Sequence, residues 1–576
     1  TKATESTSSE AESTTVTPSA TESSASATES QAETSSSASA KPSSGAAAIG
    51  ANGVLALGGV AAAILALTST LQKKCRLEKH WNVNRNNVLV ATGGLASKTS
   101  TTVRSSRCAH SAAPRPEAAT PHQTLSHTHP SAIMEDHDKA VKSIAAQVKH
   151  FQDIQKPFRI YHGSTNSTRR SSRRTDNTID TSSLTKVISI DKATRIATSV
   201  EIVLATGEIQ RVSKTENKEL FWGAASAFGT LGVVTLLEVE LREAKSHVQM
   251  TYTLSKSVAQ SLQVMQESKS ADYIDGITFS DHETVTCVGK LADLPADQEE
   301  VRVRQKNEPW YYIHMLDVLK KLNSLSSKGT VVDYMPIEDY LFRYDRGGFW
   351  VAKYAYRYFL TPFNRITRRV LNRFMHARIM YRAVHKSGLA DMYMIQDVGV
   401  PYDAVDEFQT WLHDQYNIYP LWLCPLRVQR DDPESCHGLH SEFGKPNAPN
   451  LMNFGIWGPL KGNRRQVVDQ NRALERKVAE LGGKKWLYAH TYYTEDEFWA
   501  QYDKASYDAL RKKYGAEYLP SVYDKVKVDV DAEEAAARAT VKSRIKSTIA
   551  GVWPVRGAYG FYKAIRGGDY LLQPKK

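Results

Sequence analysis

The sequence predicts an α+β fold for residues 134–530, preceded by a Ser/Thr-rich region and one apolar helix. Three observations lead to this prediction. The composition changes sharply near residues 44, 67 and 133. Beyond residue 133, stretches with apolar residues at helical spacing alternate with Val- and Ile-rich stretches that favour strands. No G-x-G-x-x-G or P-loop motif occurs, which argues against a separate NAD(P)-binding Rossmann domain.

Residues 1–44 consist almost entirely of Ser, Thr, Ala, Glu and Pro. Such a composition cannot bury enough apolar surface to offset the entropy lost on ordering, so we expect a disordered stalk. Residues 68–133 mix Pro, His, Ser and Arg without an apolar face. We expect a disordered linker here as well, because the spacing of the histidines from His110 to His129 fits no standard metal site.

Between these two regions, Gly45–Leu67 is an uncharged stretch long enough to span a hydrocarbon core of about 30 Å. A GPI-type tail is the alternative, but such a tail should end a protein and this stretch is internal. Lys73, Lys74 and Arg76 follow it directly. The positive-inside rule therefore places the residues after Leu67 in the cytosol, and we expect a single-pass membrane protein.

The net charge of +12 and the cysteine pattern exclude several classes of protein. The 5 cysteines are odd in number and widely spaced, without a C-x-x-C pair, which argues against a disulfide scaffold and a zinc ribbon. A basic balance favours anionic partners. No recognised nucleic-acid-binding module accompanies the charge, so we expect a membrane or a phosphate-bearing ligand instead of nucleic acid, and no metal site.

Residues 134–245 contain the elements with the clearest patterns. Val141, Ile144, Val148 and Phe151 fall at helical spacing and predict an amphipathic helix from about Met134. Strands are predicted at 158–161, at 185–191 and within 195–213, where Thr206-Gly207 marks a hairpin turn. A short helix at 215–226 and a further strand after Gly232 complete this part.

Helices and strands alternate from residue 246 to about residue 530. The stretch 363–384 carries apolar residues at helical spacing, and Arg365, Arg368, Arg369, Arg373 and Arg382 lie elsewhere around the helix. This pattern is typical of a helix that lies on an anionic membrane surface, and it also fits a packed helix with a solvated basic face. Residues 531–576 form a tail that mixes aromatic residues with Lys and Arg, as interfacial segments do.

A loop of small polar residues, HGSTNST, follows the strand at 158–161. Consecutive backbone N–H groups in such a loop can form an anion-binding nest, and Gly163 lets the backbone approach a phosphate closely. The short hydroxyl and amide side chains add hydrogen-bond donors. Because the same residue types are ordinary turn formers, the residues alone leave phosphate binding and a plain turn open.

Four stretches together resemble the delta-24 sterol reductase family: HGSTNST, ENKELFWGAASAFGTLGVVTLLEVEL, YPLWLCPLRV and YTEDEFWAQYDKASYDALRKKYG. This family belongs to the FAD-linked oxidases with a vanillyl-alcohol-oxidase (PCMH) type FAD-binding domain. The resemblance runs from Met134 to about Val530. It implies a PCMH-type FAD-binding domain at 134–245, a substrate domain of α/β type at 246–530 and the basic aromatic tail at 531–576.

The resemblance also implies a function. FAD would be the cofactor and NADPH the reductant. The reaction would reduce a carbon–carbon double bond in the side chain of a sterol-like lipid at the endoplasmic reticulum membrane, with the catalytic part facing the cytosol. The loop after the first strand would hold the FAD pyrophosphate, and a second segment would lie against the cofactor, although its glycines also fit a simple helix end. The implied cofactor-binding residues are His162, Gly163, Ser164, Thr165, Asn166, Ser167, Gly229, Thr230, Leu231, Gly232 and Val233.

A proton donor for such a reduction has to come from the substrate domain. Tyr and His can deliver a proton from a fixed site, and the segment LYAHTYY offers both. We expect His490, Tyr492 and Tyr493 to include the donor. The alternative for each of them is a place in the core.

The sequence departs from the family pattern at Glu201–Ile202. In the relatives, a helix, a glycine-rich segment and a serine-rich stretch separate the strands that match RIATSVE and EIVLATGEI. Here the two strands are fused without a turn former between them, so we expect either one continuous strand or a bend that exposes Ile202 and Leu204. Either outcome predicts an incomplete FAD-binding domain and an open flavin pocket.

Three functions therefore remain open. The protein is a sterol reductase, a flavin oxidase of the same fold with another substrate, or a non-catalytic membrane protein with a defective flavin domain. The last possibility includes a faulty gene model, since Met134 resembles a natural start and residues 1–133 have no counterpart in the family. The sequence does not predict an oligomeric state.

Overall fold

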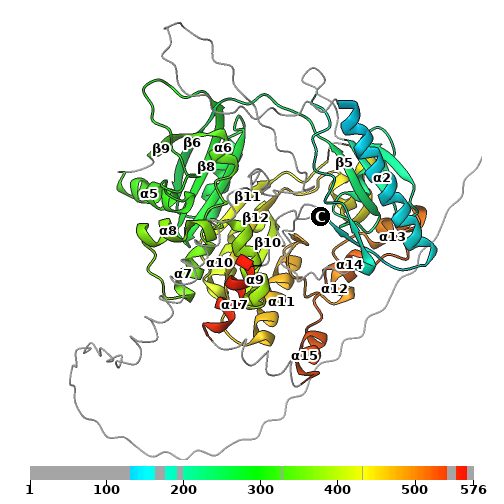
Figure 1. Ribbon diagram of the computed structural model, residues 1–576. Coiled ribbons are helices and arrows are strands. Elements are labelled where there is room, and N and C mark those ends of the chain that lie inside the picture. The colour runs from blue at the N-terminus through cyan, green and yellow to red at the C-terminus, as the bar shows by residue number, and fades with distance from the viewer. Residues whose placement is uncertain are drawn as a thin grey trace, which may run out of the picture. The chain divides into compact units, whose positions relative to one another are not determined.

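The computed structural model (Figure 1) describes residues 130–162, 175–190, 199–325, 329–430, 432–540 and 553–566. All of them belong to the second of two units into which the chain divides, Asn86–Lys576. The predicted stalk, the predicted span Gly45–Leu67 and nearly all of the predicted linker lie outside the described residues. Within the described ranges, no helix is both long and apolar enough to cross a membrane.

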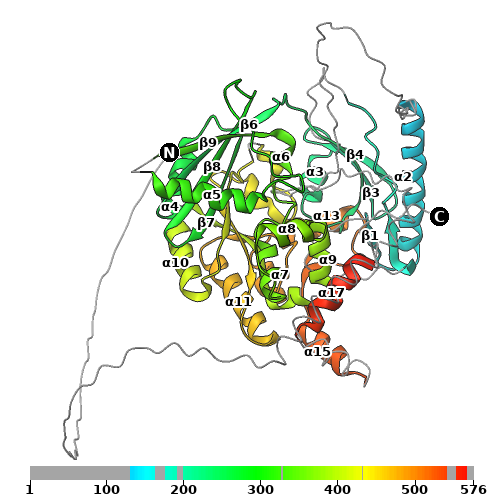
Figure 2. The same ribbon diagram turned by 60° about the vertical axis from the view of Figure 1, so that its left-hand side comes forward.

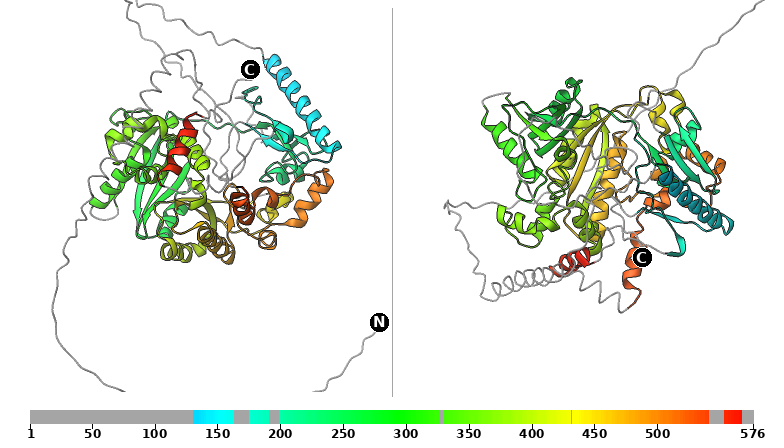
Figure 3. Two further views of the ribbon diagram at one scale, coloured as in Figure 1. Left: turned by 60° about the horizontal axis from the view of Figure 1, so that its bottom comes forward. Right: turned by 45° about the horizontal axis from the view of Figure 1, so that its top comes forward.

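The first described part is a small layer of helix and sheet. Helix α2 (Pro130–Asp153) buries Val141, Ile144 and Val148, which confirms the predicted amphipathic helix, although it begins four residues before Met134. Figure 3 shows α2, in blue and cyan, along the strands of the small sheet that it contacts. The other elements are β1 (Arg159–Tyr161), η1 (Thr175–Asn177), β2 (Thr178–Asp180), β3 (Ser199–Leu204), β4 (Ile209–Ser213), α3 (Lys218–Ala224) and β5 (Gly232–Glu238).

Two strand pairings organise this layer. β3 and β4 form an antiparallel hairpin around Thr206 and Gly207, as predicted, and Gly207 adopts a φ of +86°, which glycine tolerates without a steric penalty. β5 pairs with the other side of β3, so the sheet order is β4-β3-β5. β1 and β2 form a separate parallel pair.

β3 runs without interruption through Glu201 and Ile202, where the family's additional segment would be inserted. The register of β3 against β5 shifts between these two residues, and Thr235 is left without a partner position on β3, as in a β-bulge. The Thr235 hydroxyl donates to Glu201 Oε1 over 2.6 Å, and His137 Nε2 on α2 lies 3.0 Å from the same oxygen. Within the described residues, β3 crosses the junction as one strand, and Ile202 and Leu204 are buried instead of exposed by a bend.

The remaining elements belong mostly to the predicted substrate domain. The strands are β6 (His247–Ser255), β7 (Tyr273–Ser280), β8 (Glu283–Ala292), β9 (Thr330–Pro336), β10 (Tyr393–Pro401), β11 (Leu421–Leu426), β12 (Leu451–Pro459) and β13 (Lys484–Lys485). The helices are α4 (Val258–Glu267), α5 (Tyr311–Ser324), α6 (Ile337–Leu341), α7 (Val351–Tyr358), α8 (Arg365–Leu371), η2 (Asn372–Phe374), α9 (Ala377–Ser387), η3 (Leu389–Met392), η4 (Tyr402–Ala404), α10 (Val405–Tyr416), η5 (Pro433–Ser435), η6 (Gly438–Gly444), α11 (Arg464–Glu480), α12 (Glu495–Trp499), α13 (Lys504–Lys513), α14 (Val522–Val526), α15 (Val530–Arg538) and α17 (Val555–Arg566).

The strands from β6 to β13 form one eight-stranded sheet of order β13-β10-β12-β11-β7-β8-β6-β9. Alternate side chains enter two different cores. Leu423 and Phe454 pack with residues of α4, α10 and α11, whereas Trp422 and Cys287 pack with residues of α5 and α7. Every pairing in this sheet is antiparallel, so the part for which we expected an α/β arrangement is α+β.

The C-terminal part of the chain returns to the small sheet. Leu510, Tyr514, Ala516 and Leu519 belong to the same core as the buried residues of α2, β3 and β5. Helix α13 lies directly on α3, since a Cβ atom placed on Gly223 would clash with the Leu510 side chain. This core therefore contains residues of both predicted domains, 134–245 and 246–530.

Two expectations about local structure are wrong. Described residues 185–190 form no strand, and Val187 and Ile190 stay exposed because no neighbouring strand pairs with them. The single helix expected over 363–384 is interrupted after α8 by η2, and His376 forms a β-bridge with Arg346. The apolar stripe therefore does not make one continuous face.

Candidate functional site

The first predicted cofactor segment begins where β1 ends. His162 is exposed directly after this strand. Gly163, Ser164, Thr165, Asn166 and Ser167 lie outside the described residues, so their predicted role in binding FAD pyrophosphate stays a prediction.

The second predicted segment forms a tight turn between α3 and β5. Ser226, Phe228 and Gly229 all have positive φ angles, of 64°, 53° and 72°. Such backbone is strained for the two residues that are not glycine, and strain of this kind gathers at ligand-binding and catalytic sites. A Cβ atom on Gly229 would lie 2.5 Å from Ile160 Cδ1, so this turn contacts β1 close to the start of the first segment. The structure thus places the second segment against the strand that ends just before the first segment.

The side chains of the second segment point into protein. Thr230, Leu231 and Val233 are fully or almost fully buried. A Cβ atom on Gly232 would clash with the carbonyl oxygen of Val203, so the absence of a side chain at Gly232 leaves room for β3. A ligand at this turn would therefore meet backbone and the exposed Phe228 ring.

One cation reaches the same turn from the C-terminal part of the chain. Lys525 Nζ on α14 donates a hydrogen bond of 2.5 Å to the carbonyl oxygen of Phe228. An ammonium group beside a strained, partly exposed turn suits a phosphate group.

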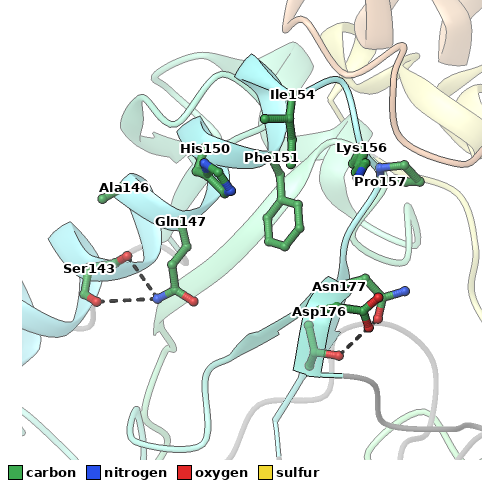
Figure 4. A pocket seen from close by; sticks show the side chains of 11 residues that line it. Ser143, Ala146, Gln147, His150, Phe151, Ile154, Lys156, Pro157, Asp176 and Asn177 are labelled. Atoms are coloured by element: carbon green, nitrogen blue, oxygen red, sulfur yellow. Dashed lines mark hydrogen bonds between the residues drawn. The ribbon is translucent and has the colours of Figure 1, made fainter.

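A pocket of about 800 Å³ lies between α2 and the segment from η1 to β2 (Figure 4). Phe151, Ile154 and Pro157 give it an apolar wall, while Gln147 and Asp176 add polar groups. None of the predicted site residues lines this pocket.

The predicted proton donors occupy buried positions near α11. The rings of His490 and Tyr492 are stacked, with centroids 6.0 Å apart, whereas Tyr493 packs with Phe498 in a different cluster. Arg464 Nη1 donates to the Tyr492 hydroxyl over 3.0 Å. Burial nevertheless raises the pKa of Tyr492 to about 12 and the pKa of Tyr493 well above its usual value.

A buried ion pair fixes the backbone of this segment. Lys485 Nζ contacts Glu475 on α11 and also donates to the carbonyl oxygen of His490. Glu475 Oε1 accepts a further hydrogen bond, of 3.0 Å, from the backbone nitrogen of Tyr492. The backbone of residues 490–492 is therefore anchored to the helix-covered face of β10.

The opposite face of β10 carries an acid that sequence reasoning missed. Asp397 follows Gln396, which bonds Asn471 on α11, so Asp397 points to the other side of the sheet. The Tyr488 hydroxyl donates to Asp397 Oδ2 over 2.6 Å. Burial raises the pKa of Asp397 to about 6, although the hydrogen bonds from Tyr488 and Asn453 act in the opposite direction.

A sequence signal for this acid exists. Asp397 interrupts a strand that is otherwise rich in Val, Ile and Met, and Tyr488 lies only two residues before His490. A carboxyl group that must be buried in a strand is a candidate for a shifted pKa. No group of three His, Cys, Asp or Glu side chains that could hold a metal ion is found in the part of the chain that the structure describes.

No family model matches the chain. Curated relatives do match. The chain is 25% identical over 347 residues to the Delta(24)-sterol reductase of Homo sapiens, covering 58% of this chain and 63% of the relative. It is 25% identical over 357 residues to the Delta(24)-sterol reductase homolog of Caenorhabditis elegans, covering 58% and 64%.

A plant relative gives the same result. The Delta(24)-sterol reductase of Arabidopsis thaliana is 27% identical over 353 residues, which cover 55% of this chain and 60% of the relative. The chain thus spans somewhat less than two thirds of the length of the curated relatives it matches. These matches confirm the family resemblance expected from the sequence motifs, and the chain is similar to the delta(24)-sterol reductases over more than half of its length.

Proposed function

We propose that this chain is an FAD-dependent oxidoreductase that uses NADPH to reduce a carbon–carbon double bond in the side chain of a sterol-like lipid. The similarity to delta(24)-sterol reductases carries the proposal. The contact between the turn at Gly229 and the strand that leads to His162 supports it, because these are the two segments assigned to the cofactor.

Different residues of the protein would bind the cofactor, place the substrate and donate the proton. The loop His162–Ser167, the turn at Phe228–Gly229 and Lys525 would hold the cofactor phosphates. When bound, a reduced flavin supplies a hydride to the substrate. The protein would place the alkene and deliver a proton from a fixed acid.

The pKa of Asp397 is closer to the range of a general acid than the pKa of Tyr492 or Tyr493. A general acid works best when its pKa lies near the working pH. The pKa of Asp397 is about 6, whereas burial raises the pKa of Tyr492 to about 12. His490 remains a candidate from the sequence, although it lies on the other face of the sheet from Asp397.

A second candidate function is a non-catalytic membrane protein. The observation that favours it is the unbroken strand β3 at Glu201–Ile202, where the family has a longer connection. The core around β3 is closed without that connection, so the small sheet can be stable while the flavin ring lacks its enclosure. A flavin oxidase of the same fold is the third possibility.

Flavin content and turnover of the purified 576-residue protein test these functions. The reductase proposal expects yellow absorbance with added FAD, and NADPH-dependent loss of a double bond from a sterol side chain. Gly163→Val should weaken FAD binding by about 1 kcal/mol or more, because a side chain blocks close backbone approach. A protein that stays colourless with excess FAD would support the non-catalytic function, and hydrogen peroxide production without sterol reduction would support the oxidase.

A family-length insert between Glu201 and Ile202 provides the complementary test. If the missing connection is what opens the flavin pocket, the protein as it stands has little or no reductase activity and the insert restores it. Full FAD occupancy and turnover by the unmodified protein would contradict this.

Topology is part of the proposal. Gly45–Leu67 would anchor the protein in the endoplasmic reticulum membrane with the following residues in the cytosol. Protease added to sealed microsomes should then digest the part after Leu67, and protection of that part would overturn the assignment.

A further inference from the structure

Large apolar side chains are exposed on two helices that are far apart in the sequence. Leu360, Ile366 and Val370 lie on α8 or shortly before it, and Trp553, Tyr559 and Tyr562 lie on α17 or shortly before it. Their exposed fractions are Leu360 58%, Ile366 74%, Val370 65%, Trp553 53%, Tyr559 46% and Tyr562 39%. The Phe374 ring of η2, directly after α8, packs against the Phe561 ring of α17 with centroids 5.1 Å apart, so the two helices lie close together, and we call this set the α8–α17 surface.

Helix α17 is held firmly, so its exposed residues do not result from loose packing. Trp553 Nε1 donates to the carbonyl oxygen of Tyr358 over 2.8 Å, and Arg556 Nε donates to that of Ser387 over 2.8 Å. A Cβ atom on Gly560 would clash with the Ala383 carbonyl oxygen. The inner face of α17 is thus built of small residues against α9, beside which Figure 2 shows it in red. The large side chains Tyr559 and Tyr562 are left on the outside.

Helix α8 has no buried side chain, and its contacts are more local than those of α17. The guanidinium of Arg368 lies 4.9 Å from the centre of the Phe363 ring and donates to the Phe363 carbonyl oxygen over 3.1 Å. Its polar contacts are therefore directed into the protein. Ile366 and Val370, one turn apart, form the outward face, with exposed Arg365 and Arg369 beside them.

The two segments that form this surface carry charged side chains of one sign, although Asp391 lies 4.0 Å from Arg556 on the inner side of α17. No Asp or Glu occurs from Leu360 to Ala390 or from Trp553 to Arg566. Lys563 Nζ lies 5.6 Å above the Tyr559 ring, and the Arg566 guanidinium lies 5.8 Å from the Tyr562 ring. Aromatic rings with cationic groups at their edges are typical of segments at a membrane interface.

We propose that the α8–α17 surface docks on the surface of an anionic phospholipid bilayer. Ile366, Val370 and the aromatic rings of α17 enter the boundary between headgroups and acyl chains, while the arginines contact lipid phosphates. This differs from the expectation drawn from the sequence, because only part of the stripe at 363–384 faces outward and α17 supplies the rest. The proposal depends neither on the reductase function nor on the predicted span at Gly45–Leu67.

Flotation of the full-length protein with vesicles tests the proposal. The vesicles contain phosphatidylcholine alone or with about 30% phosphatidylserine, at low and high salt. The wild type should have a binding component that requires phosphatidylserine and falls at high salt. Ile366→Glu with Val370→Glu should weaken this component by about tenfold or more, since two inserted apolar groups become charged. A variant with two reversed charges, Arg365→Glu with Arg369→Glu, should lose most of the salt-sensitive binding.

Matched controls are Ile209→Glu and Val332→Glu, which place the same charge on exposed apolar positions of β4 and β9. Thermal unfolding should show that all variants keep the fold, because the replaced side chains are exposed. Hydrogen exchange should slow in peptides covering α8 and α17 when the charged vesicles are added.

Some outcomes would overturn the proposal. An unchanged salt-sensitive component of vesicle binding in the Ile366→Glu, Val370→Glu variant would do so, because the predicted span at Gly45–Leu67 accounts only for binding that does not require phosphatidylserine. A second contrary outcome is a wild-type dimer that this variant converts to monomer without a change in vesicle binding, because the surface would then join two copies of the protein.

Discussion

Tyr507 donates a hydrogen bond of 2.7 Å to the side-chain oxygen of Thr230, although 277 residues separate the two in the sequence. The same hydroxyl accepts a hydrogen bond of 3.0 Å from the backbone nitrogen of Val522. Arg511, one turn further along α13, donates to the carbonyl oxygens of Thr230, Leu519 and Pro520. The strained turn before β5 is therefore positioned by the C-terminal part of the chain.

Arg511→Leu should destabilise the protein strongly. The substitution leaves several buried carbonyl oxygens without a donor, and each lost partner costs about 1–3 kcal/mol. We expect a loss of about 3 kcal/mol or more in the free energy of unfolding, measured by urea denaturation. Arg538→Leu is the control, because Arg538 is exposed and forms a surface ion pair with Glu534, and its effect should stay below about 0.5 kcal/mol.

Asp397 predicts a dependence of stability on pH. Its pKa is about 6 in the folded protein and lower in the unfolded protein, about 3.9. The folded state therefore binds more protons between these values, and its stability falls as pH rises from about 4 to about 6 and then levels off. In urea denaturation, Asp397 should make the wild type about 1 kcal/mol less stable at about pH 7.5 than at about pH 5. The Asp397→Asn variant should lack this difference. An unchanged pH dependence in the variant would mean that another group titrates there.

Gly232→Ala should be more destabilising than Gly482→Ala. The new Cβ atom at Gly232 would clash with the Val203 carbonyl oxygen and would force β5 away from β3. At Gly482 only Pro401 lies within 4.0 Å, and the penalty comes from its φ of +69°. We expect losses of about 3 kcal/mol and about 1 kcal/mol respectively. Thermal or urea denaturation measures both losses of stability, and equal losses would show that β3 can move away from residue 232 at little cost.

Replacing Lys485 alone should destabilise the protein more than replacing Lys485 and Glu475 together. Their side chains are 0% and 1% exposed. Lys485→Met leaves a buried carboxylate without its cation, which costs about 3–5 kcal/mol. The double variant Lys485→Met, Glu475→Gln should recover a large part of that loss. A double variant as unstable as the single one would show that the contact of Lys485 with the His490 carbonyl matters more than the ion pair.

Local patterns in the sequence predicted the local structure well. The hairpin around Thr206-Gly207 and helix α2 both follow from residues close together in the chain. The expected strand at 185–191 failed because strand formation needs a neighbour, and β2 at Thr178–Asp180 took the place beside β1. The residues in and around 178–180 and 185–191 do not indicate which of these two segments forms the strand.

Long-range contacts explain the rest. The break between α8 and α9 depends on the bridge from His376 to Arg346, and an ion pair of 2.7 Å with Asp345 holds His376 there. At the candidate site, the sequence indicated His490 because it lies among aromatic residues. Asp397 could be identified only from the structure, because the pairing of β10 shows which face of the sheet it occupies. The register of a sheet is what decides such a residue's surroundings.

The core shared by α2, β3, β5 and residues 510–519 has a consequence for biosynthesis. A ribosome makes the protein from its N-terminus, so the small sheet emerges some 270 residues before Leu510, Tyr514 and Leu519 can reach it. Until then, its apolar face stays open to water and to other proteins. The nascent protein should therefore need a chaperone to shield that face during synthesis, and the core of the small sheet should close only after residues 510–519 have been made.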